Sequence, residues 1–411
     1  MVRLEVEENE IDGFALNGEV ASELDVKEGD LLIAKNPINH KTVPGRLEIN
    51  DSLEKNKVVM DRTSFESIGL DEGFAISVSP YQEDIKNVTE AEFGIRKAKD
   101  SSSDNPLSII KENEDSFLQF LKGKLVTKDS EVLWGEKGLI LSIKETYPEL
   151  RSEDVGDFTD LEEFSYSWGG SGLQSFDGVL LIDLSGSMET KDLAMDEIDW
   201  VLNRMDRSVK GSNTSEFLKN LKERAQIKRS DGAALCGLIY FVQKIGRGVG
   251  DKISVILFSD EASPVEFDEK RFFSSEMSDP ETASENIIDE VNYYPRGQTN
   301  ISDGLLESIE TIKSFDHDKM KMIVLLTDGK PHPPSIDEPE EVLDIVEKRL
   351  APRKDVIINT IGLGDDVDHH LLDEIASRTG GEYVYVNSLQ GLTEAYSRYA
   401  TSISIKATSF R

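Results

Sequence analysis

The second half of the chain alternates between two hydrophobic patterns. Nearly continuous runs of Val, Ile and Leu are separated by segments in which apolar residues recur every three or four positions. Such runs are typical of parallel strands buried on both faces, and the longer period is typical of amphipathic helices. The pattern predicts a doubly wound, Rossmann-like α/β domain over residues 176–411. Its expected strands lie at 178–185, 251–260, 321–329 and 355–365, and its expected helices at 230–246, 302–315, 340–350 and 369–380.

An internal repeat occupies the N-terminal part of the chain. Residues 16–34 align without a gap with residues 60–78, and Gly29 matches Gly73. Each copy is expected to form a strand, a short helix, a turn and a second strand, with the glycine providing the positive φ of the turn. The duplication implies two halves of one barrel, and a repeat kept only for folding is the alternative to a functional one.

This repeat resembles the double-psi β-barrel that begins the N-terminal domain of valosin-containing-protein type AAA ATPases. Residues 117–158 are similar to the small β subdomain that follows the barrel in that family. The resemblance implies a barrel over 1–82 and a small β subdomain over 83–165, together a module that docks adaptors and substrates without chemistry of its own. No phosphate-loop motif of the ATPase follows, and the Gly- and Ser-rich segment 166–175 is expected to be a linker.

The charge of the chain narrows the classes of partner. The 80 acidic residues outnumber the 46 basic ones and give a formal net charge of −34, which argues against nucleic acid as a partner. No apolar run approaches the roughly 18 residues needed to span a membrane, and the N-terminus is too acidic for a signal peptide. The single cysteine, Cys236, lies in an apolar run and is expected to be a buried, unreactive thiol. These features predict a cytoplasmic protein without a membrane partner.

Oxygen-bearing side chains follow the carboxyl ends of predicted strands in the α/β domain, where such sheets bind ligands. Asp183, Ser185 and Ser187 follow the first strand, Asp328 follows a later one, and Thr299 lies between them at a loop-to-helix junction. Carboxylates and hydroxyls without His or Cys suit a hard divalent cation, with Mg²⁺ favoured and Mn²⁺ as the alternative. Alternate side chains of an extended loop point to one side, so the Asp-x-Ser-x-Ser spacing predicts three donors facing one ion.

These five residues resemble the metal-ion-dependent adhesion site of von Willebrand factor type A domains, and the resemblance covers residues 176 to about 400. It implies that the two serines and the threonine supply hydroxyl ligands, while the two aspartates act largely through bound water and orient the hydroxyls. It also implies an open coordination position that accepts a carboxylate, usually a Glu or Asp of a partner protein.

The chain departs from that family pattern in an insert over about 189–229. Residues 192–205 of the insert have helical spacing, and its basic and acidic residues are about equal in number. We expect the insert to frame the partner surface or to cap the metal site, with Trp200 as an anchor for the partner. Packing of Trp200 onto its own domain is the alternative.

The sequence thus predicts a non-enzymatic interaction protein whose barrel docks one partner and whose metal site binds an acidic residue of another. By the barrel's resemblance, an AAA ATPase or its substrate is an expected partner, and the pairing of the two modules suggests an archaeal adaptor. The alternative is a metal-bearing accessory subunit of an AAA ATPase-driven chelatase or cofactor-insertion system. A metal-dependent phosphoesterase would need a nucleophile or base beside the ion, and the sequence reveals neither. His332, four residues after Asp328, is a further candidate for the metal rim, with an exposed loop position as the alternative.

Overall fold

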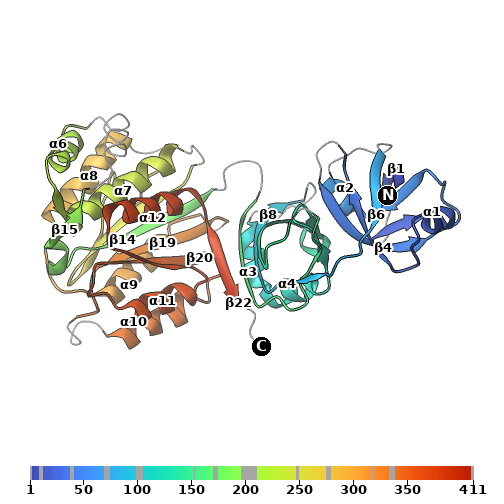
Figure 1. The fold of residues 1–411 in the computed structure, drawn as a ribbon. Helices are drawn as coiled ribbons and strands as arrows, with labels where there is room; N and C mark the ends of the chain where they lie inside the picture. Colours follow the sequence, from blue (N-terminus) through green and yellow to red (C-terminus); the bar gives the residue numbers. More distant parts are fainter. Residues whose placement is uncertain are drawn as a thin grey trace. The chain divides into compact units, whose positions relative to one another are not determined.

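The computed structural model describes residues 2–8, 13–37, 41–68, 75–98, 105–151, 153–169, 175–195, 211–246, 250–274, 279–316, 318–332 and 338–408. The chain divides into two compact units, which are described separately (Figure 1). Unit 1 comprises residues 1–171 together with 407–411, and unit 2 comprises residues 172–406. The division falls within the expected linker 166–175, into which strand β13 (Glu163–Trp168) extends.

Unit 1 begins with a closed six-stranded barrel in the order β1-β5-β2-β4-β3-β6, as the repeat predicts. Each strand of one repeat copy pairs antiparallel with its equivalent in the other, β2 with β5 and β3 with β6. Gly29 has the expected positive φ of +83°, whereas Gly73 lies outside the described residues. The elements are β1 (Val2–Glu8), β2 (Phe14–Leu16), α1 (Gly18–Glu23), β3 (Leu31–Lys35), β4 (Thr42–Ile49), β5 (Lys57–Met60), α2 (Arg62–Ile68) and β6 (Ala75–Pro80).

The rest of unit 1 is built around a second sheet in which β10, β11, β8 and β13 lie in this order. Its core is aromatic, with Phe93 making edge contacts to Phe117 and Phe158. A small sheet, β7-β12-β9, lies in the same unit. The elements are β7 (Lys86–Asn87), β8 (Glu90–Lys97), α3 (Pro106–Glu112), α4 (Glu114–Leu121), β9 (Leu125–Val126), β10 (Glu131–Trp134), η1 (Gly135–Lys137), β11 (Leu139–Tyr147), β12 (Gly156–Asp157) and β13.

Unit 2 is organised by a six-stranded sheet in the order β18-β17-β14-β19-β20-β21. Neighbouring strands are parallel except for the antiparallel edge strand β18. All residues of β14, β19 and β20 are buried, which is why the sequence shows unbroken apolar runs there. The predicted doubly wound sheet is confirmed. The strands are β14 (Phe176–Asp183), β17 (Ile253–Phe258), β18 (Ala262–Pro264), β19 (Met320–Thr327), β20 (Val356–Leu363) and β21 (Tyr383–Val386).

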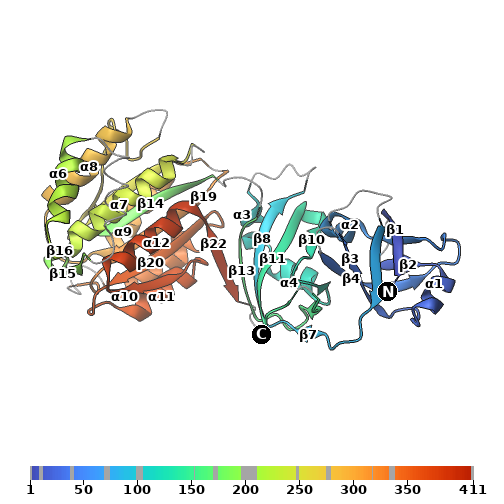
Figure 2. The ribbon, with the colours of Figure 1, turned by 45° about the horizontal axis from the view of Figure 1, so that its top comes forward.

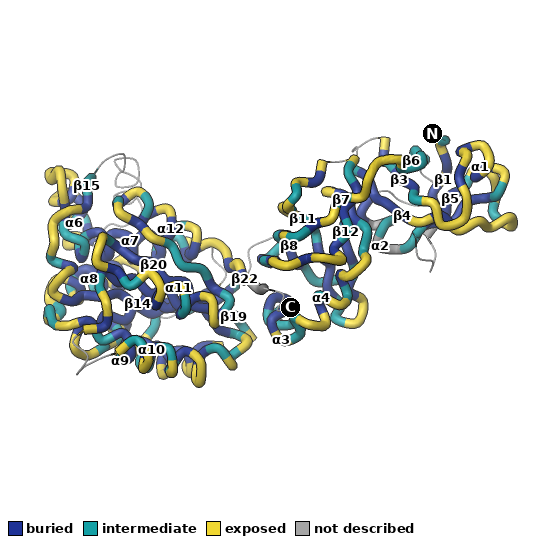
Figure 3. Tube along the Cα trace, turned by 60° about the horizontal axis from the view of Figure 1, so that its bottom comes forward, coloured by how far each residue is buried: buried dark blue, intermediate teal, exposed yellow. Residues whose placement is uncertain are grey.

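Helices cover both faces of this sheet (Figures 1 and 2). Helices α7, α8 and α12 lie on one face, and α9, α10 and α11 pack on the other through a shared apolar core. Figure 3 shows the central strands buried along their length, while the helices expose one side to solvent. The helices are α7 (Arg229–Gly246), α8 (Pro280–Tyr293), α9 (Ile301–Ile312), α10 (Pro339–Ile345) continued by η3 (Val346–Leu350), α11 (His369–Ser377) and α12 (Leu389–Thr401). The last strand, β22 (Ser404–Thr408), begins in unit 2 and ends in unit 1.

The insert contains more strand than expected. It follows the turn η2 (Gly186–Glu189), and its described part forms β15 (Lys191–Ala194), α6 (Ser212–Lys222) and β16 (Gln226–Lys228). The prediction of a helix from residue 192 was wrong for its first residues, because β15 pairs antiparallel with β16 and its backbone bonds are made there. Residues 196–210, including Trp200, lie outside the described residues, so its role as an anchor stays a prediction.

Two further expectations concern burial and the membrane. Cys236 in α7 is completely buried, and burial raises the pKa of its thiol to about 12, so the thiol is protonated and unreactive as predicted. Within the described parts of the chain, none of the helices combines the length and apolar character needed to cross a bilayer.

Candidate metal centre

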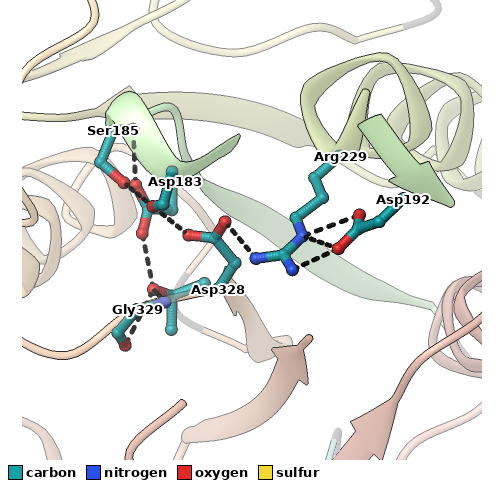
Figure 4. A network of polar contacts seen from close by, with 8 residues as sticks. Asp183, Ser185, Asp192, Arg229, Asp328 and Gly329 are labelled. Atoms are coloured by element: carbon teal, nitrogen blue, oxygen red, sulfur yellow. Dashed lines mark hydrogen bonds and ion pairs between the residues drawn. The ribbon is translucent and has the colours of Figure 1, made fainter. Parts of the chain in front are cut away.

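Two neighbouring strands bring the predicted carboxylates to one edge of the unit 2 sheet. β14 ends at Asp183, and β19 ends at Thr327 with Asp328 next in the chain. The strands are parallel and paired with Ile182 opposite Leu326, so their carboxyl ends lie side by side. Figure 4 shows the resulting network of polar side chains.

Asp183 is held through both of its carboxylate oxygens. The residue is completely buried. Its Oδ2 accepts a hydrogen bond from Oγ1 of Thr327 at 2.6 Å, and its Oδ1 accepts one from the backbone N–H of Ser185 at 2.7 Å. The backbone N–H of Gly329 in turn donates to Oγ1 of Thr327 at 3.2 Å. The carboxylate therefore has a fixed orientation toward the loops at this edge.

Two serine hydroxyls connect this edge to Asp328. The Oγ atoms of Ser185 and Ser187 lie 3.1 Å apart, and Oγ of Ser187 donates to Oδ1 of Asp328 at 2.6 Å. The expectation of an extended loop was wrong beyond Ser185, because residues Gly186–Glu189 form a 3₁₀ turn. Side chains two positions apart in an extended chain are separated by about 7 Å. The turn is what brings the two hydroxyls within hydrogen-bond distance.

Thr299 reaches the same place from the loop that precedes α9. Its backbone N–H and C=O bond to the backbone of His332 at 3.1 and 3.2 Å, which fixes the loop beside the segment after β19. A Cβ added to Gly329 would lie 3.4 Å from Oγ1 of Thr299 and 3.9 Å from Oγ of Ser187. The absence of a side chain at Gly329 therefore leaves a hollow bordered by both hydroxyls.

The structure thus gathers all of the predicted donors at one edge of the sheet: Asp183, Ser185, Ser187, Thr299 and Asp328. The other candidate, His332, contributes through its backbone, and the residue itself is exposed.

The two carboxylates of the site carry negative charge into a buried place. Burial, followed by the nearby negative charge of Asp328, raises the pKa of Asp183 to about 7, although hydrogen bonds from Thr327 and Ser185 oppose the shift. Burial also raises the pKa of Asp328, although hydrogen bonds from Ser187 and Arg229 oppose that shift. Such a pair favours either a proton or a bound cation over two isolated charges.

Arg229 is a residue of this site that the sequence did not single out, as are Thr327, Gly329 and Glu189. Its Nη1 donates to Oδ2 of Asp328 at 2.9 Å, and its Nε donates to Oδ1 of Asp192 at 3.0 Å. Arg229 is the last residue of the predicted insert, and 99 positions separate it from Asp328. No local motif marks a contact of that separation, so only its place at the end of the insert could have drawn attention to it.

Glu189 is the centre of a second cluster of polar side chains, at the end of the turn η2. Its carboxylate accepts hydrogen bonds from Lys228, Ser230 and Arg296. Burial alone would raise the pKa of Glu189, but the bonds from Lys228 and Arg296 outweigh it and lower the pKa. Glu189 is therefore ionised, and it ties the turn η2 to strand β16 and to the loop that carries Thr299.

The donor set fits a hard divalent cation. Two hydroxyls border the hollow at Gly329, a third lies 3.1 Å from one of them, and two buried carboxylates supply compensating negative charge. In the described ranges, no group of three or more His, Cys, Asp or Glu side chains is arranged to hold a metal ion. An ion at this edge would therefore depend on the Ser and Thr hydroxyls, a chemistry that suits Mg²⁺ or Mn²⁺.

Comparison with known proteins agrees with the fold of unit 2. A family model described as the von Willebrand factor type A domain matches residues 177–398, more than half of the chain. The "Uncharacterized protein YwmD" of Bacillus subtilis (strain 168) is 30% identical over 107 residues, which make up 26% of this chain and 46% of that protein. The chain thus spans about half the length of the curated relative that it matches.

Solved structures similar to this chain include three from different sources. A von Willebrand factor type A protein from Catenulispora acidiphila has a TM-score of 0.39 at 15% identity, covering 55% of this chain and 42% of its own. The ArnB paralog VWA2 from Sulfolobus acidocaldarius has a TM-score of 0.33 at 19% identity, covering 56% of this chain and 47% of its own. Proximal thread matrix protein 1 from the mussel byssus, with a zinc-occupied MIDAS motif, has a TM-score of 0.34 at 18% identity, covering 60% and 50%. Because the family model covers residues 177–398, the chain belongs to the von Willebrand factor type A domain family.

Proposed function

We propose that unit 2 is a metal-dependent adhesion module that binds a divalent cation, Mg²⁺ or Mn²⁺. The residues that would hold the ion are Ser185, Ser187 and Thr299 through their hydroxyls, and Asp183 and Asp328 largely through water. The bound ion would supply an electrophilic position that accepts a Glu or Asp side chain of a partner protein. The hollow at Gly329, bordered by two hydroxyls and backed by buried carboxylates, is the observation that carries this proposal.

The module is proposed to bind a partner and not to catalyse a reaction. A general base must be able to reach a proton of the substrate. Asp183 is instead fixed by Thr327 and Ser185, and Asp328 is fixed by Ser187 and Arg229. These contacts suit carboxylates that orient hydroxyls and balance the charge of an ion.

For unit 1 we propose docking of a second partner, which would make the chain a cytoplasmic adaptor. Its closed barrel supports the resemblance to the AAA ATPase module, and an AAA ATPase or its substrate is the proposed partner. A cavity of about 420 Å³ in this unit is lined by charged residues of both signs, which suits a polar peptide segment: Arg46, Asp61, Lys122, Lys124 and Glu131. An accessory subunit of an ATPase-driven chelatase is the alternative, and it predicts stimulation of ATP hydrolysis when the partner ATPase is added.

The adhesion proposal is tested by direct measurement of metal binding and of metal-dependent capture. Isothermal titration with Mg²⁺ should show one site in the wild type and none in the double variant Ser185→Ala/Ser187→Ala. The matched control is Ser314→Ala/Ser377→Ala, which removes two hydroxyls that bond only to backbone carbonyls of their own segments. Partners captured from native lysate should be lost with the site variant and with a chelator, and retained by the control. Partners that persist under both conditions would contradict metal-bridged adhesion.

A further inference from the structure

The β15–β16 ribbon of the insert places the positively charged guanidinium of Arg229 against the candidate metal site. Strand β15 carries Asp192, and β16 leads directly into Arg229, the first residue of α7. The backbone N–H of Arg229 donates to the carbonyl of Thr190 at 3.0 Å, which fixes the start of its side chain. Figure 4 shows the guanidinium between the carboxylates of Asp192 and Asp328.

The two carboxylates that share Arg229 differ in their surroundings. The side chain of Asp328 is fully buried, that of Arg229 is 11% exposed, and that of Asp192 is 42% exposed. The guanidinium also lies on the backbone at Gly364, where φ is +84° and an added Cβ would lie 2.5 Å from Nη2. Arg229 is thus confined between an inner carboxylate at the site and an outer one at the surface.

Asp328 divides its negative charge between two neighbours. Its Oδ1 accepts the hydroxyl of Ser187, one of the proposed metal ligands, and its Oδ2 accepts Nη1 of Arg229. A divalent cation at Ser187 would therefore share the charge of Asp328 with a guanidinium already in place. Like charges close together in a poorly solvated site repel strongly. Asp192 attracts the same guanidinium toward the surface. The carboxylates of Asp192 and Asp328 therefore compete for Arg229.

We infer that Arg229 is a built-in counter-charge that weakens the affinity of the site for its divalent cation, and that Asp192 relieves this competition by drawing the guanidinium toward the surface. The inference rests on the proposed metal function and adds its regulation. The insert then sets the affinity of the site for its metal ion through the guanidinium of Arg229. A partner that engages Asp192 or Arg229 would change that affinity.

The test is a double-mutant cycle on the full chain with Mn²⁺ and Mg²⁺ as probes, read by isothermal titration and by the electron paramagnetic resonance signal of free Mn²⁺. Arg229→Gln should lower the dissociation constant of the ion at least tenfold. Asp192→Asn should raise it severalfold, because the guanidinium then pairs with Asp328 alone. In the double variant, Asp192→Asn should have little further effect. Competition predicts that the dissociation constant changes in opposite directions in Arg229→Gln and Asp192→Asn. If the two side chains only supported the structure of the site, both substitutions would weaken binding.

Two controls separate this inference from general effects of charge and of folding. Lys330→Gln removes one positive charge two positions from Asp328, from a side chain that is 56% exposed, and should change the dissociation constant by less than a factor of three. Asp192→Asn alters a side chain that is 42% exposed and keeps its shape, so it keeps the inference falsifiable if Arg229→Gln does not fold.

The outcomes distinguish the inference from the function on which it rests. Unchanged or weaker metal binding in folded Arg229→Gln would overturn the inference and leave the metal site intact. An equal effect of Asp192→Asn with and without Arg229 would also overturn it. Absence of any bound ion in all four proteins would overturn the proposed metal function, and the inference with it.

Discussion

Thr327 donates a 2.6 Å hydrogen bond from Oγ1 to Oδ2 of Asp183 and so ties the ends of two parallel strands together. Both residues are completely buried. The partner on this oxygen is a neutral hydroxyl, so the bond orients the carboxylate without neutralising it. The negative charge of Asp183 remains available to compensate a cation at the hollow beside it.

Replacing Thr327 by Val should destabilise the metal-free protein more than an equivalent change elsewhere in the sheet. Thr327→Val removes a hydrogen bond to a buried carboxylate and should lower the free energy of unfolding by about 2–3 kcal/mol. The matched control is Thr360→Val in β20, whose hydroxyl donates at 2.8 Å to the carbonyl of Leu372 and should cost about 1 kcal/mol. Urea denaturation at pH 8 in the presence of a chelator measures both. Equal losses would show that Asp183 does not depend on this hydroxyl.

The stability of the metal-free protein should fall as the pH rises from 4 to 7, relative to the variant Asp183→Asn. Burial, followed by the charge of Asp328, raises the pKa of Asp183 from its ordinary 3.8 to about 7 in the folded chain. The folded state then binds a proton that the unfolded state releases between these two values. The proton on Asp183 therefore adds to the free energy of unfolding. This stabilisation is fully present below pH 4 and is lost as the pH rises through 7, with an upper limit of about 4 kcal/mol.

Urea unfolding at half-unit steps of pH measures the difference in the free energy of unfolding between the wild type and Asp183→Asn. The variant is the reference because Asn does not titrate. Mg²⁺ at 100 times its dissociation constant should restore about 2.7 kcal/mol to the wild type at pH 7.5. Parallel pH profiles of the wild type and Asp183→Asn would contradict the raised pKa.

The sheet and the donor set were predictable because each depends on a local pattern. Strands buried on both faces require unbroken apolar runs, and β14 and β19 show them. Once those strands are parallel neighbours, the residues after them must meet, which is why Asp183 and Asp328 could be paired from sequence. The hydroxyls followed from their spacing, although the 3₁₀ turn that brings Ser187 to Ser185 did not.

Arg229 was not predictable, because its contact depends on tertiary structure. The ribbon of β15 and β16 must first fold back toward the sheet before a residue at the start of α7 can reach Asp328. Apolar spacing in the insert suggested a helix from residue 192, but pairing between the two strands overrides that local preference. Long-range pairs of this kind leave no periodic trace in the sequence.

Gly329→Ala should weaken metal binding at least tenfold with little loss of stability. The new Cβ would lie 3.4 Å from Oγ1 of Thr299 and 3.9 Å from Oγ of Ser187, which are ordinary contacts, so the fold can accept it. It would nevertheless occupy the hollow that the hydroxyls border. The control is Gly391→Ala in α12, whose Cβ would meet Oγ of Ser388 at the same 3.4 Å away from the site. Titration with Mg²⁺ and thermal unfolding compare the two, and unchanged affinity in Gly329→Ala would place the ion elsewhere.

Lys244→Met should destabilise unit 2 strongly while leaving its affinity for the metal ion unchanged. The Nζ atom of Lys244 lies 2.6 Å from Oδ2 of Asp251, and both side chains are almost completely buried. The same Nζ donates to the carbonyl of Phe176 at the first residue of β14. Removing one member of a buried ion pair leaves an uncompensated charge and costs about 3–5 kcal/mol.

This ion pair lies at the amino end of β14, and the candidate metal centre lies at the carboxyl end, roughly 23 Å away along the strand. Lys252→Met is the matched control, because its pair with Asp316 is partly solvated and should contribute less than about 1 kcal/mol. Chemical denaturation and Mg²⁺ titration of both variants, carried out below the onset of unfolding, separate stability from binding. A change of more than threefold in the dissociation constant of Lys244→Met would mean that the two ends of the strand are coupled, and that the site is not positioned by its local hydrogen bonds alone.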